Sequence, residues 1–335
     1  MNLFNAIEKE DFVELKRLIE KDNLDVNTVD YNSGDSLLIA ACYTNSLKIV
    51  EYLVNNGANI NFKDDSEMTC FMIACINGKL DIADFLLSRG ANINDKDDEG
   101  NTSLIWACIK NNFDMIDFLL SKGANINDKD DEGMTCFMIA CNEGKFNISK
   151  FLLSRGANIN DKDYQGNSCL IWACYQSKFQ NVKFLIENGA NVNDKDNQKI
   201  TCLMWACNKN NLNIVKLLLA KGADKDAKNK NGQTALQLTN NPEIKQLLKI
   251  WTPTMAAAVL DELNVLSGFD PETIRIDLPE YIGKPVFDAN GEIIRYEGGR
   301  RKKNKSKKSK KSKKSKKSKK SKKSKKSKKS IKRRK

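Results

Sequence analysis

DDEGNTSLIWACIKNNFDMIDFLLSKGANINDK, the segment of residues 97–129, holds one complete unit of a pattern that recurs along the chain. Its Gly-Ala-Asn-Ile-Asn phrase returns every 33 residues, with Ile or Val in fourth place, and the glycines are Gly57, Gly90, Gly123, Gly156 and Gly189. A cysteine keeps the same step at Cys42, Cys75, Cys108, Cys141, Cys174 and Cys207. A strict period of this length is typical of a solenoid, in which each repeat is a small unit that stacks on its neighbours.

This unit predicts a turn, two short helices and a loop. Thr102 follows the turn residues and can cap a helix, because its hydroxyl can accept a hydrogen bond from a free amide of the first helical turn. Apolar residues follow at helical spacing, first before Asn111 and then between Asn111 and Gly123. Asn and Gly tolerate the left-handed backbone that ends a helix. Other copies hold at the Asn111 position Asn45, Gly78, Gly144, Ser177 and Asn210. We therefore expect an all-α solenoid of 33-residue turn-helix-helix-loop units.

The unit resembles the ankyrin repeat. The family phrase Thr-Pro-Leu-His-x-Ala-Ala is matched by Thr69 to Cys75, by Thr102 to Cys108 and by four further copies, and the family ending is matched by Leu86 to Asn94. The resemblance covers about residues 1–250. It implies a capping repeat at 1–28, six ankyrin repeats at 29–226 and a second capping repeat at 227–250.

The family histidine is missing, since the chain contains no His. Its place is taken by Met72, Ile105, Met138, Ile171 and Met204. The hydrogen bonds that this histidine usually makes cannot form, so we expect the repeats to cohere more through apolar packing.

Part of the array looks like a duplication of two repeats. Residues 68–75 and 134–141 are identical. Together with the abundance of Asn, Ile and Lys, this makes the chain resemble the ankyrin families that are expanded in giant amoeba-infecting DNA viruses.

Residues 251–299 break the period. The stretch from Thr254 to Leu260 predicts a short helix, and two apolar segments flank Asn290-Gly291, a strong signal for a two-residue hairpin. A segment of fewer than about 50 residues is too short for an independent core. We expect a small α/β C-terminal flap that docks on the last repeat.

Charge divides the chain sharply. Residues 300–335 hold 25 of the 56 basic residues and none of the 43 acidic ones, so they carry +25 while the preceding residues carry −12. Ser-Lys-Lys triplets with almost no apolar side chain predict a disordered basic tail.

Three roles stay open for this tail: nuclear or nucleolar targeting through an import receptor, nonspecific binding of nucleic acid or another polyanion, and solubility. Lysines can bind phosphate backbones by counterion release, but without aromatic side chains the tail cannot read bases. The residues predicted to contact a polyanion include Lys307, Lys308, Lys316, Lys317, Lys332, Arg333, Arg334 and Lys335.

The composition argues against an enzyme. A chain without His lacks the commonest general base and zinc ligand, and no phosphate-binding loop is present. Cysteines 33 residues apart lie about one repeat apart, too far to share one metal ion. We expect no catalytic residue, no cofactor and no metal.

The ten cysteines lie in apolar helical phrases, which predicts buried free thiols and a reducing compartment. Residues 1–20 show no apolar run behind a basic start, and no window is apolar enough for a membrane span. The expected location is the cytoplasm or nucleus, of a host cell if the chain is viral.

The ankyrin resemblance implies a monomeric scaffold that binds a protein partner on its concave face, at the turn tips and the inner helices. The predicted tip contacts are Asp65, Ser66, Asp98, Glu99, Asp131, Glu132, Tyr164, Gln165, Asn197 and Gln198. The predicted helix contacts are Ile76, Asn77, Ile109, Lys110, Asn142, Glu143, Tyr175, Gln176, Asn208 and Lys209.

Other interpretations of these residues stay open. The acidic tips could simply be solvated, and Trp106, Trp172 and Trp205 fit either partner contact or packing between repeats. The rival function is a nucleic-acid-associated protein that acts mainly through the tail.

Overall fold

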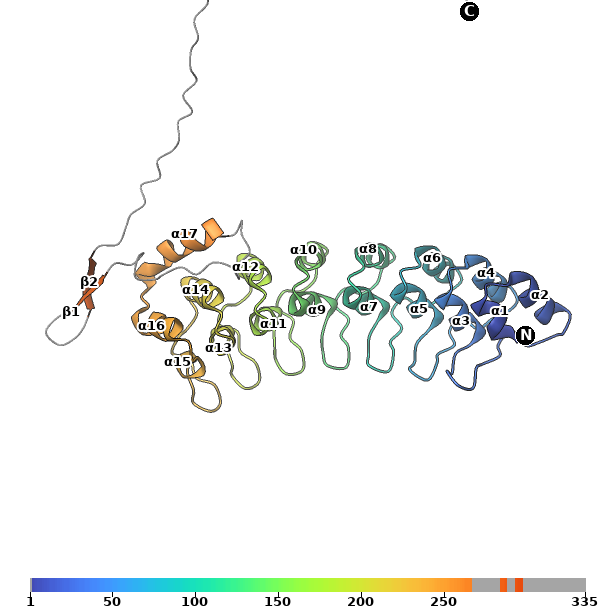
Figure 1. Cartoon of the computed structure of the whole chain (residues 1–335), viewed down its shortest axis with the longest axis horizontal. Helices are drawn as coiled ribbons and strands as arrows, with labels where there is room; N and C mark the ends of the chain where they lie inside the picture. Colours follow the sequence, from blue (N-terminus) through green and yellow to red (C-terminus); the bar gives the residue numbers. More distant parts are fainter. Residues whose placement is uncertain (1, 267–283, 288–292, 298–335) are drawn as a thin grey trace, which may run out of the picture. The chain divides into compact units, whose positions relative to one another are not determined.

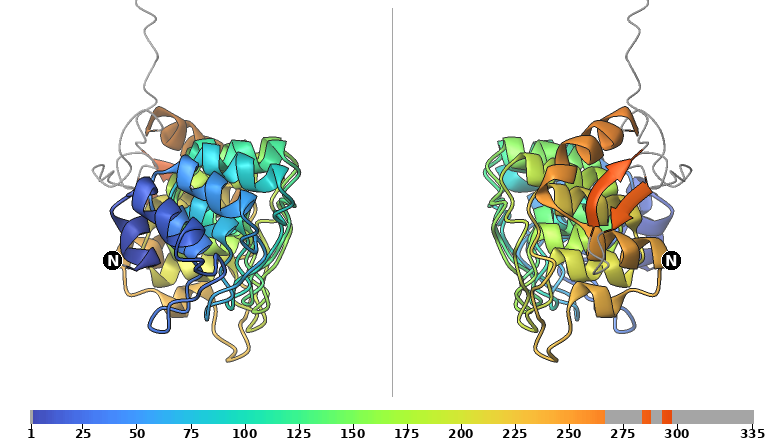
Figure 2. Two further views of the ribbon diagram at one scale, coloured as in Figure 1. Left: turned by 90° about the vertical axis from the view of Figure 1, so that its right-hand side faces the viewer. Right: turned by 90° about the vertical axis from the view of Figure 1, so that its left-hand side faces the viewer.

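A computed structural model describes residues 2–266, 284–287 and 293–297 (Figure 1). The chain separates into two compact units, residues 1–274 and 275–335. In the first unit the helices stack in pairs, and the loops between successive pairs extend to one side (Figure 1, Figure 2). The prediction of an all-α solenoid built from turn-helix-helix-loop units is confirmed.

Each repeat contributes a short inner helix and a slightly longer outer helix. The inner helices are α3 (Leu37–Tyr43), α5 (Cys70–Ile76), α7 (Ser103–Ile109), α9 (Cys136–Glu143), α11 (Cys169–Tyr175) and α13 (Cys202–Asn208). The outer helices are α4 (Leu47–Asn55), α6 (Leu80–Ser88), α8 (Phe113–Ser121), α10 (Phe146–Ser154), α12 (Phe179–Glu187) and α14 (Leu212–Ala220). The array is flanked by α1 (Leu3–Glu8), α2 (Phe12–Glu20), α15 (Ala235–Leu238) and α16 (Pro242–Ile250).

Side-chain hydroxyls begin the inner helices, as predicted. Thr102 Oγ1 accepts a hydrogen bond from the Ile105 N–H at 3.4 Å. The equivalent bond is made by Ser36, Thr69, Thr135 and Thr201. Ser168 departs from this pattern, because its buried hydroxyl has no hydrogen-bond partner within the part of the chain that the structure describes.

Left-handed residues follow the inner helices. Positive φ values occur, as expected, at Gly78, Asn111, Gly144, Ser177 and Asn210. Ser177 takes φ +58° although it is neither Asn nor Gly, so its backbone is held there at some cost. Asn45 differs from the expectation, because α3 ends early and Thr44 at its C-cap is extended.

Small residues let successive inner helices approach closely. One alanine in each repeat has no exposed surface, and these residues are Ala74, Ala107, Ala140, Ala173 and Ala206. The inner helices that carry them contact their neighbours directly, α5 with α7, α7 with α9, α9 with α11 and α11 with α13. This column of alanines therefore sets the distance between repeats.

Replacing Ala140 with Leu is expected to destabilise the chain by about 1–3 kcal/mol, because the buried site has no room for three more carbons. Since solenoid stability is a sum over neighbouring repeats, a central defect should also split the urea transition into two steps. The matched control is Ala257→Leu at an exposed position of the last helix, which should change little. An unchanged single transition for Ala140→Leu would mean that this packing is not limiting.

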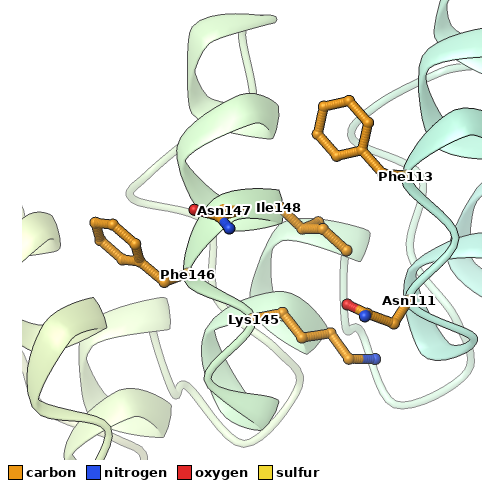
Figure 3. Close-up of a pocket in the computed structure, with 6 residues that line it drawn as sticks. All are labelled: Asn111, Phe113, Lys145, Phe146, Asn147 and Ile148. Carbon is orange, nitrogen blue, oxygen red and sulfur yellow. The ribbon is translucent and has the colours of Figure 1, made fainter.

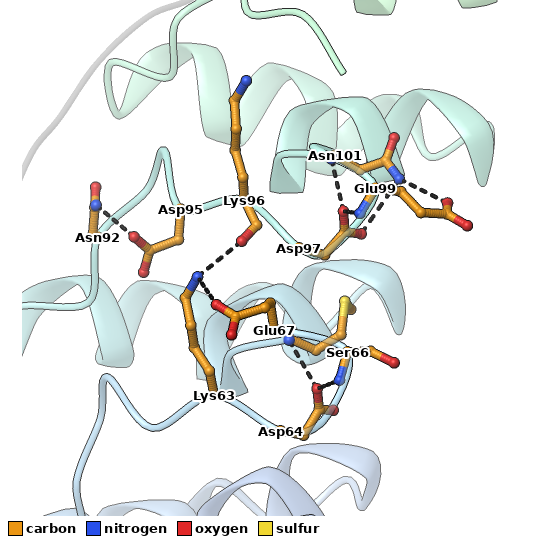
Figure 4. Close-up of polar contacts among 11 residues, drawn as sticks. Lys63, Asp64, Ser66, Glu67, Asn92, Asp95, Lys96, Asp97, Glu99 and Asn101 are labelled. Carbon is orange, nitrogen blue, oxygen red and sulfur yellow. Dashed lines mark hydrogen bonds and ion pairs between the residues drawn. The ribbon is translucent and has the colours of Figure 1, made fainter. Parts of the chain in front are cut away.

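Hydrogen bonds also link the repeats, so apolar packing is not the only compensation for the missing histidine. Lys63 Nζ donates to the backbone carbonyl of Lys96 at 3.0 Å (Figure 4). The same bond recurs from Lys96 to Lys129 at 2.5 Å, from Lys129 to Lys162 at 2.7 Å and from Lys162 to Lys195 at 3.1 Å. This lysine ladder ties consecutive loops together along the array.

The first unit ends in a helix that docks on the repeats. The short 3₁₀ turn η1 (Pro253–Met255) leads into α17 (Ala256–Leu266), which confirms the helix predicted near Thr254. It packs on the outer helix α14 and buries Val259 and Leu263. Lys216 of α14 and Glu262 of α17 form a buried ion pair, with 2.8 Å between Nζ and Oε1.

The second unit contains the predicted hairpin strands, β1 (Lys284–Phe287) and β2 (Ile293–Glu297), which pair antiparallel. Lys284 lies opposite Glu297, and the register shifts between Val286 and Phe287. The Asn290-Gly291 turn and the whole basic tail, with its predicted polyanion contacts, lie outside the described residues.

Candidate protein-binding surface

A recurring aspartate builds each turn tip from within. Asp97 Oδ1 accepts backbone hydrogen bonds from Glu99 at 3.1 Å and Asn101 at 2.7 Å, and the residue is only 8% exposed (Figure 4). The same pair of bonds is made in their own repeats by Asp64, Asp130 and Asp196. This aspartate is structural, and the two residues that follow it are left facing solvent.

All ten predicted tip residues are exposed, and we call them the tip row: Asp65, Ser66, Asp98, Glu99, Asp131, Glu132, Tyr164, Gln165, Asn197 and Gln198. Adjacent tips are joined by backbone hydrogen bonds. The Asp131 N–H donates to the Glu99 carbonyl at 3.0 Å, and the Tyr164 N–H donates to the Glu132 carbonyl at 3.1 Å. The tips thus form one continuous, hydrogen-bonded edge.

Two glycines show how closely the tips approach. Gly100 has φ +77°, and a Cβ there would lie 2.4 Å from Asp131 Oδ1 and 2.7 Å from the Asp131 nitrogen. A Cβ at Gly133, which has φ +82°, would lie 2.8 Å from the Tyr164 nitrogen. Each tip therefore rests on the glycine of the preceding turn, which fixes the position of its side chain.

The charge of the tip row changes along the array. Its first three tips carry the acids Asp65, Asp98, Glu99, Asp131 and Glu132, and its last two tips carry no charge. A hollow of about 360 Å³ lies between two acidic tips and is lined by Asp98, Glu99, Asn101, Asp130, Asp131 and Glu132. This end of the row presents carboxylates to any molecule that approaches.

The predicted helix contacts also face outward. They lie at or just after the C-terminal ends of the inner helices, and each is exposed or half-buried: Ile76, Asn77, Ile109, Lys110, Asn142, Glu143, Tyr175, Gln176, Asn208 and Lys209. Glu143 has a structural partner, since it pairs with Lys145. Lys145 Nζ also donates to the carbonyls of Cys108 and Ile109 at 2.7 and 2.8 Å and so caps α7.

Tryptophans join the inner helices to the tips. Trp106 Nε1 donates to Asp97 Oδ2 at 2.7 Å, and Trp172 Nε1 donates to Asp163 Oδ2 at 2.9 Å. Trp205 holds the same position in the next repeat, yet its Nε1 is buried and has no hydrogen-bond partner among the described residues. The exposed faces of the inner helices are therefore turned toward the tips.

Tyr175 unites two of these tryptophans. Its ring centroid lies 5.8 Å from that of Trp172 and 4.8 Å from that of Trp205, both edge-on, and Lys209 Nζ lies 4.1 Å from its centroid. We call Trp172, Tyr175 and Trp205 the aromatic shelf. All three side chains are half-buried, so they both pack between repeats and offer an apolar surface.

A signal for the tryptophan bonds is present in the sequence. Asn101 precedes Trp106 by five residues, and its side chain also binds Asp97; Asn167 stands in the same relation to Trp172. Ile200 replaces this Asn before Trp205, which is the tryptophan without a partner. Comparing the turn with the helix of each repeat would have revealed this pairing.

A larger hollow, about 520 Å³, lies between the first turns of α8 and α10 and is lined by Asn111, Phe113, Lys145, Phe146, Asn147 and Ile148 (Figure 3). Phe113 at its edge is 44% exposed. The lining residues include no carboxylate, and the Lys145 ammonium is occupied by two carbonyls and Glu143. This hollow offers no acid–base pair.

All ten cysteines are buried free thiols, as predicted. Thiols of neighbouring repeats meet in pairs: Cys42 with Cys70, Cys108 with Cys136, Cys141 with Cys169 and Cys174 with Cys202. The members of a pair are 28 residues apart, so comparing equivalent positions 33 residues apart does not find them. Burial raises the pKa of Cys75 and Cys207 to about 12.

Within the described ranges, no cluster of three or more Cys, Asp or Glu side chains is arranged to hold a metal ion. The same part of the chain contains no helix with the length and apolar character that crossing a bilayer requires.

A stack of helix pairs with one hydrogen-bonded edge of exposed turns defines a repeat scaffold rather than a catalytic domain. The sequence model described as ankyrin repeats (3 copies) matches residues 3–64, 56–130, 127–196 and 170–249, and the chain belongs to the ankyrin repeat family. The crystal structure of the human ASB11 ankyrin repeat domain is similar, with a TM-score of 0.57 and 27% identity. The match covers 64% of this chain and 97% of that one. Membership indicates a protein-interaction scaffold, and the family is typically non-enzymatic.

Proposed function

We propose that the chain binds a protein partner along its concave surface, by which we mean the tip row together with the exposed ends of α5, α7, α9, α11 and α13. The observation that carries the proposal is the contrast within each tip. Asp97 is buried and holds the turn, whereas Asp98 and Glu99 are exposed and held in place without serving the fold. A rigid row whose side chains differ from repeat to repeat is suited to recognising one protein surface.

The basic tail has a separate place in this proposal. With a charge of +25, it would contact an import receptor or a polyanion while the repeats hold the partner. The buried free thiols support a reducing location, cytoplasm or nucleus, and we expect a monomer. The duplicated repeats support an origin among the ankyrin families of giant amoeba-infecting DNA viruses, in which case the location is inside a host cell.

The rival function is favoured by the charge of the tail alone: a nucleic-acid-associated protein in which residues 300–335 provide the binding and the repeats are passive. The two functions predict opposite effects for two variants of the full-length chain. One is Asp98→Lys/Asp131→Lys in the tip row, and the other replaces every Lys and Arg of residues 300–335 with Gln.

Affinity capture from cell lysate, quantified by mass spectrometry, separates these functions. A scaffold should lose its main protein partner in the tip variant and keep it in the tail variant. If the tail variant loses the partner and the tip variant keeps it, the proposed function is wrong and the rival gains support.

A further inference from the structure

The aromatic shelf has an unfilled hydrogen-bonding position. In two repeats the tryptophan N–H is satisfied by a turn aspartate, Asp97 or Asp163. Trp205 Nε1 has no such partner in the described part of the chain, although it is shielded from solvent. A buried donor without an acceptor is unfavourable, and a backbone carbonyl from a bound chain would satisfy it.

The shelf also lies next to the acidic part of the tip row. The tip before α11 is joined to the acidic tip before α9, because the Tyr164 N–H donates to the Glu132 carbonyl at 3.1 Å. Asp98, Asp131 and Glu132 form no ion pair with another described side chain. Their charge is thus available to a cationic partner.

Charge also gives the surface a direction. The acidic tips precede the shelf, whereas Lys199 and Lys209 are exposed at its far end, and Lys209 lies over the Tyr175 ring. A basic segment is attracted to the first end and repelled from the second. Aromatic surfaces with a polar handle are favoured anchors for protein partners.

We propose that the partner of this surface is an extended peptide segment in which a Lys/Arg run lies on Asp98, Asp131 and Glu132 and an adjoining apolar residue lies on the aromatic shelf. The carbonyl next to that apolar residue accepts the Trp205 Nε1–H hydrogen bond. This inference rests on the proposed function and adds the chemistry and direction of the partner to it.

Random peptides displayed on phage provide the probe. The target is the full-length chain whose tail Lys and Arg are replaced by Gln, so that the tail does not select acidic peptides. The expected result is enrichment of peptides that carry a basic run with a large apolar residue always on the same side. Enrichment of acidic peptides, of peptides without a fixed order, or of none would overturn the inference.

Variants then locate the binding of an enriched peptide. Trp205→Phe keeps the ring and removes only the N–H, and Asp98→Asn/Asp131→Asn removes two tip charges; each should weaken binding about tenfold or more. The matched control is Asp81→Asn/Asp114→Asn, which removes two exposed charges from the outer helices and should leave binding unchanged.

The outcomes separate this inference from the proposed function. Peptides that lose binding with Tyr175→Ala but ignore Trp205→Phe and the tip charges retain the concave surface and refute the partner chemistry. Peptides that ignore all concave variants and respond to the control variant refute both.

Discussion

Raising the pH from about 8 to about 10 is expected to remove on the order of 8 kcal/mol from the free energy of unfolding of the repeats. Six buried thiols have a raised pKa in the folded chain: Cys42, Cys75, Cys108, Cys169, Cys174 and Cys207. Unfolding returns each to its ordinary value of 9.0. At pH about 10 each of them favours unfolding by about 1.4 kcal/mol, because only the unfolded chain releases the proton.

The sign follows from which state holds the proton. The folded chain keeps its thiols protonated above pH 9.0, toward the value of about 12 reached by Cys75 and Cys207. Their contribution to stability is therefore complete below the ordinary pKa and is lost as the pH rises through the folded pKa. Many domains have a total stability of about 5–15 kcal/mol, so the repeats should be close to unfolding at the upper pH.

Urea unfolding followed by circular dichroism at a series of pH values measures this loss. A Cys108→Ala/Cys174→Ala variant is the matched control, since removing two of the six thiols should reduce the loss by about 3 kcal/mol. Stability that stays flat over this range, or a loss that the double variant leaves unchanged, would contradict the assignment of these thiols as buried and protonated.

Replacing Glu262 with Ala is expected to release α17 from the repeats. Lys216 is 1% exposed and Glu262 is 7% exposed, so losing the carboxylate leaves an uncompensated ammonium under the helix. The docked state should lose about 3–5 kcal/mol. Because α17 is the last helix of the first unit that the structure describes, its detachment lets water reach Lys216 at less cost than unfolding the repeats.

Hydrogen exchange measures this effect locally. The amides of residues 256–266 should exchange nearly as fast as in a free peptide in Glu262→Ala, while those of α9 and α11 keep their protection. In the matched control, Lys216→Met/Glu262→Leu, both charges are replaced by apolar groups, and α17 should stay docked. If Glu262→Ala leaves exchange in α17 unchanged, the ion pair does not control docking.

Local features of the repeats could be predicted from the sequence because each depends on residues within one unit. The Thr102 cap and the left-handed Asn111 are set by neighbours within three or four residues, and both are where the pattern places them. The column represented by Ala140 follows from the period, since equivalent small residues must face equivalent neighbours. Asn45 was misjudged because the end of α3 depends on Thr44, which the other repeats do not share.

Contacts between different positions of neighbouring repeats were harder to predict. The pair Cys42–Cys70 and the bond from Lys63 to Lys96 depend on how far one unit is shifted against the next, which no spacing along the chain reveals. The site shows the same division. Exposure of Asp98 followed from its place in the turn, whereas the unsatisfied Trp205 N–H emerges only when the helix is placed beside its turn.

Photo-crosslinking tests the central claim, that the partner lies on the concave surface, most directly. A photoreactive phenylalanine is introduced into the full-length chain either at Gln176, beside the aromatic shelf, or at Asp114 on an outer helix; both side chains are exposed. With the purified partner bound, the account predicts cross-links from position 176 and none from position 114. Cross-links from position 114 without any from position 176 would contradict it.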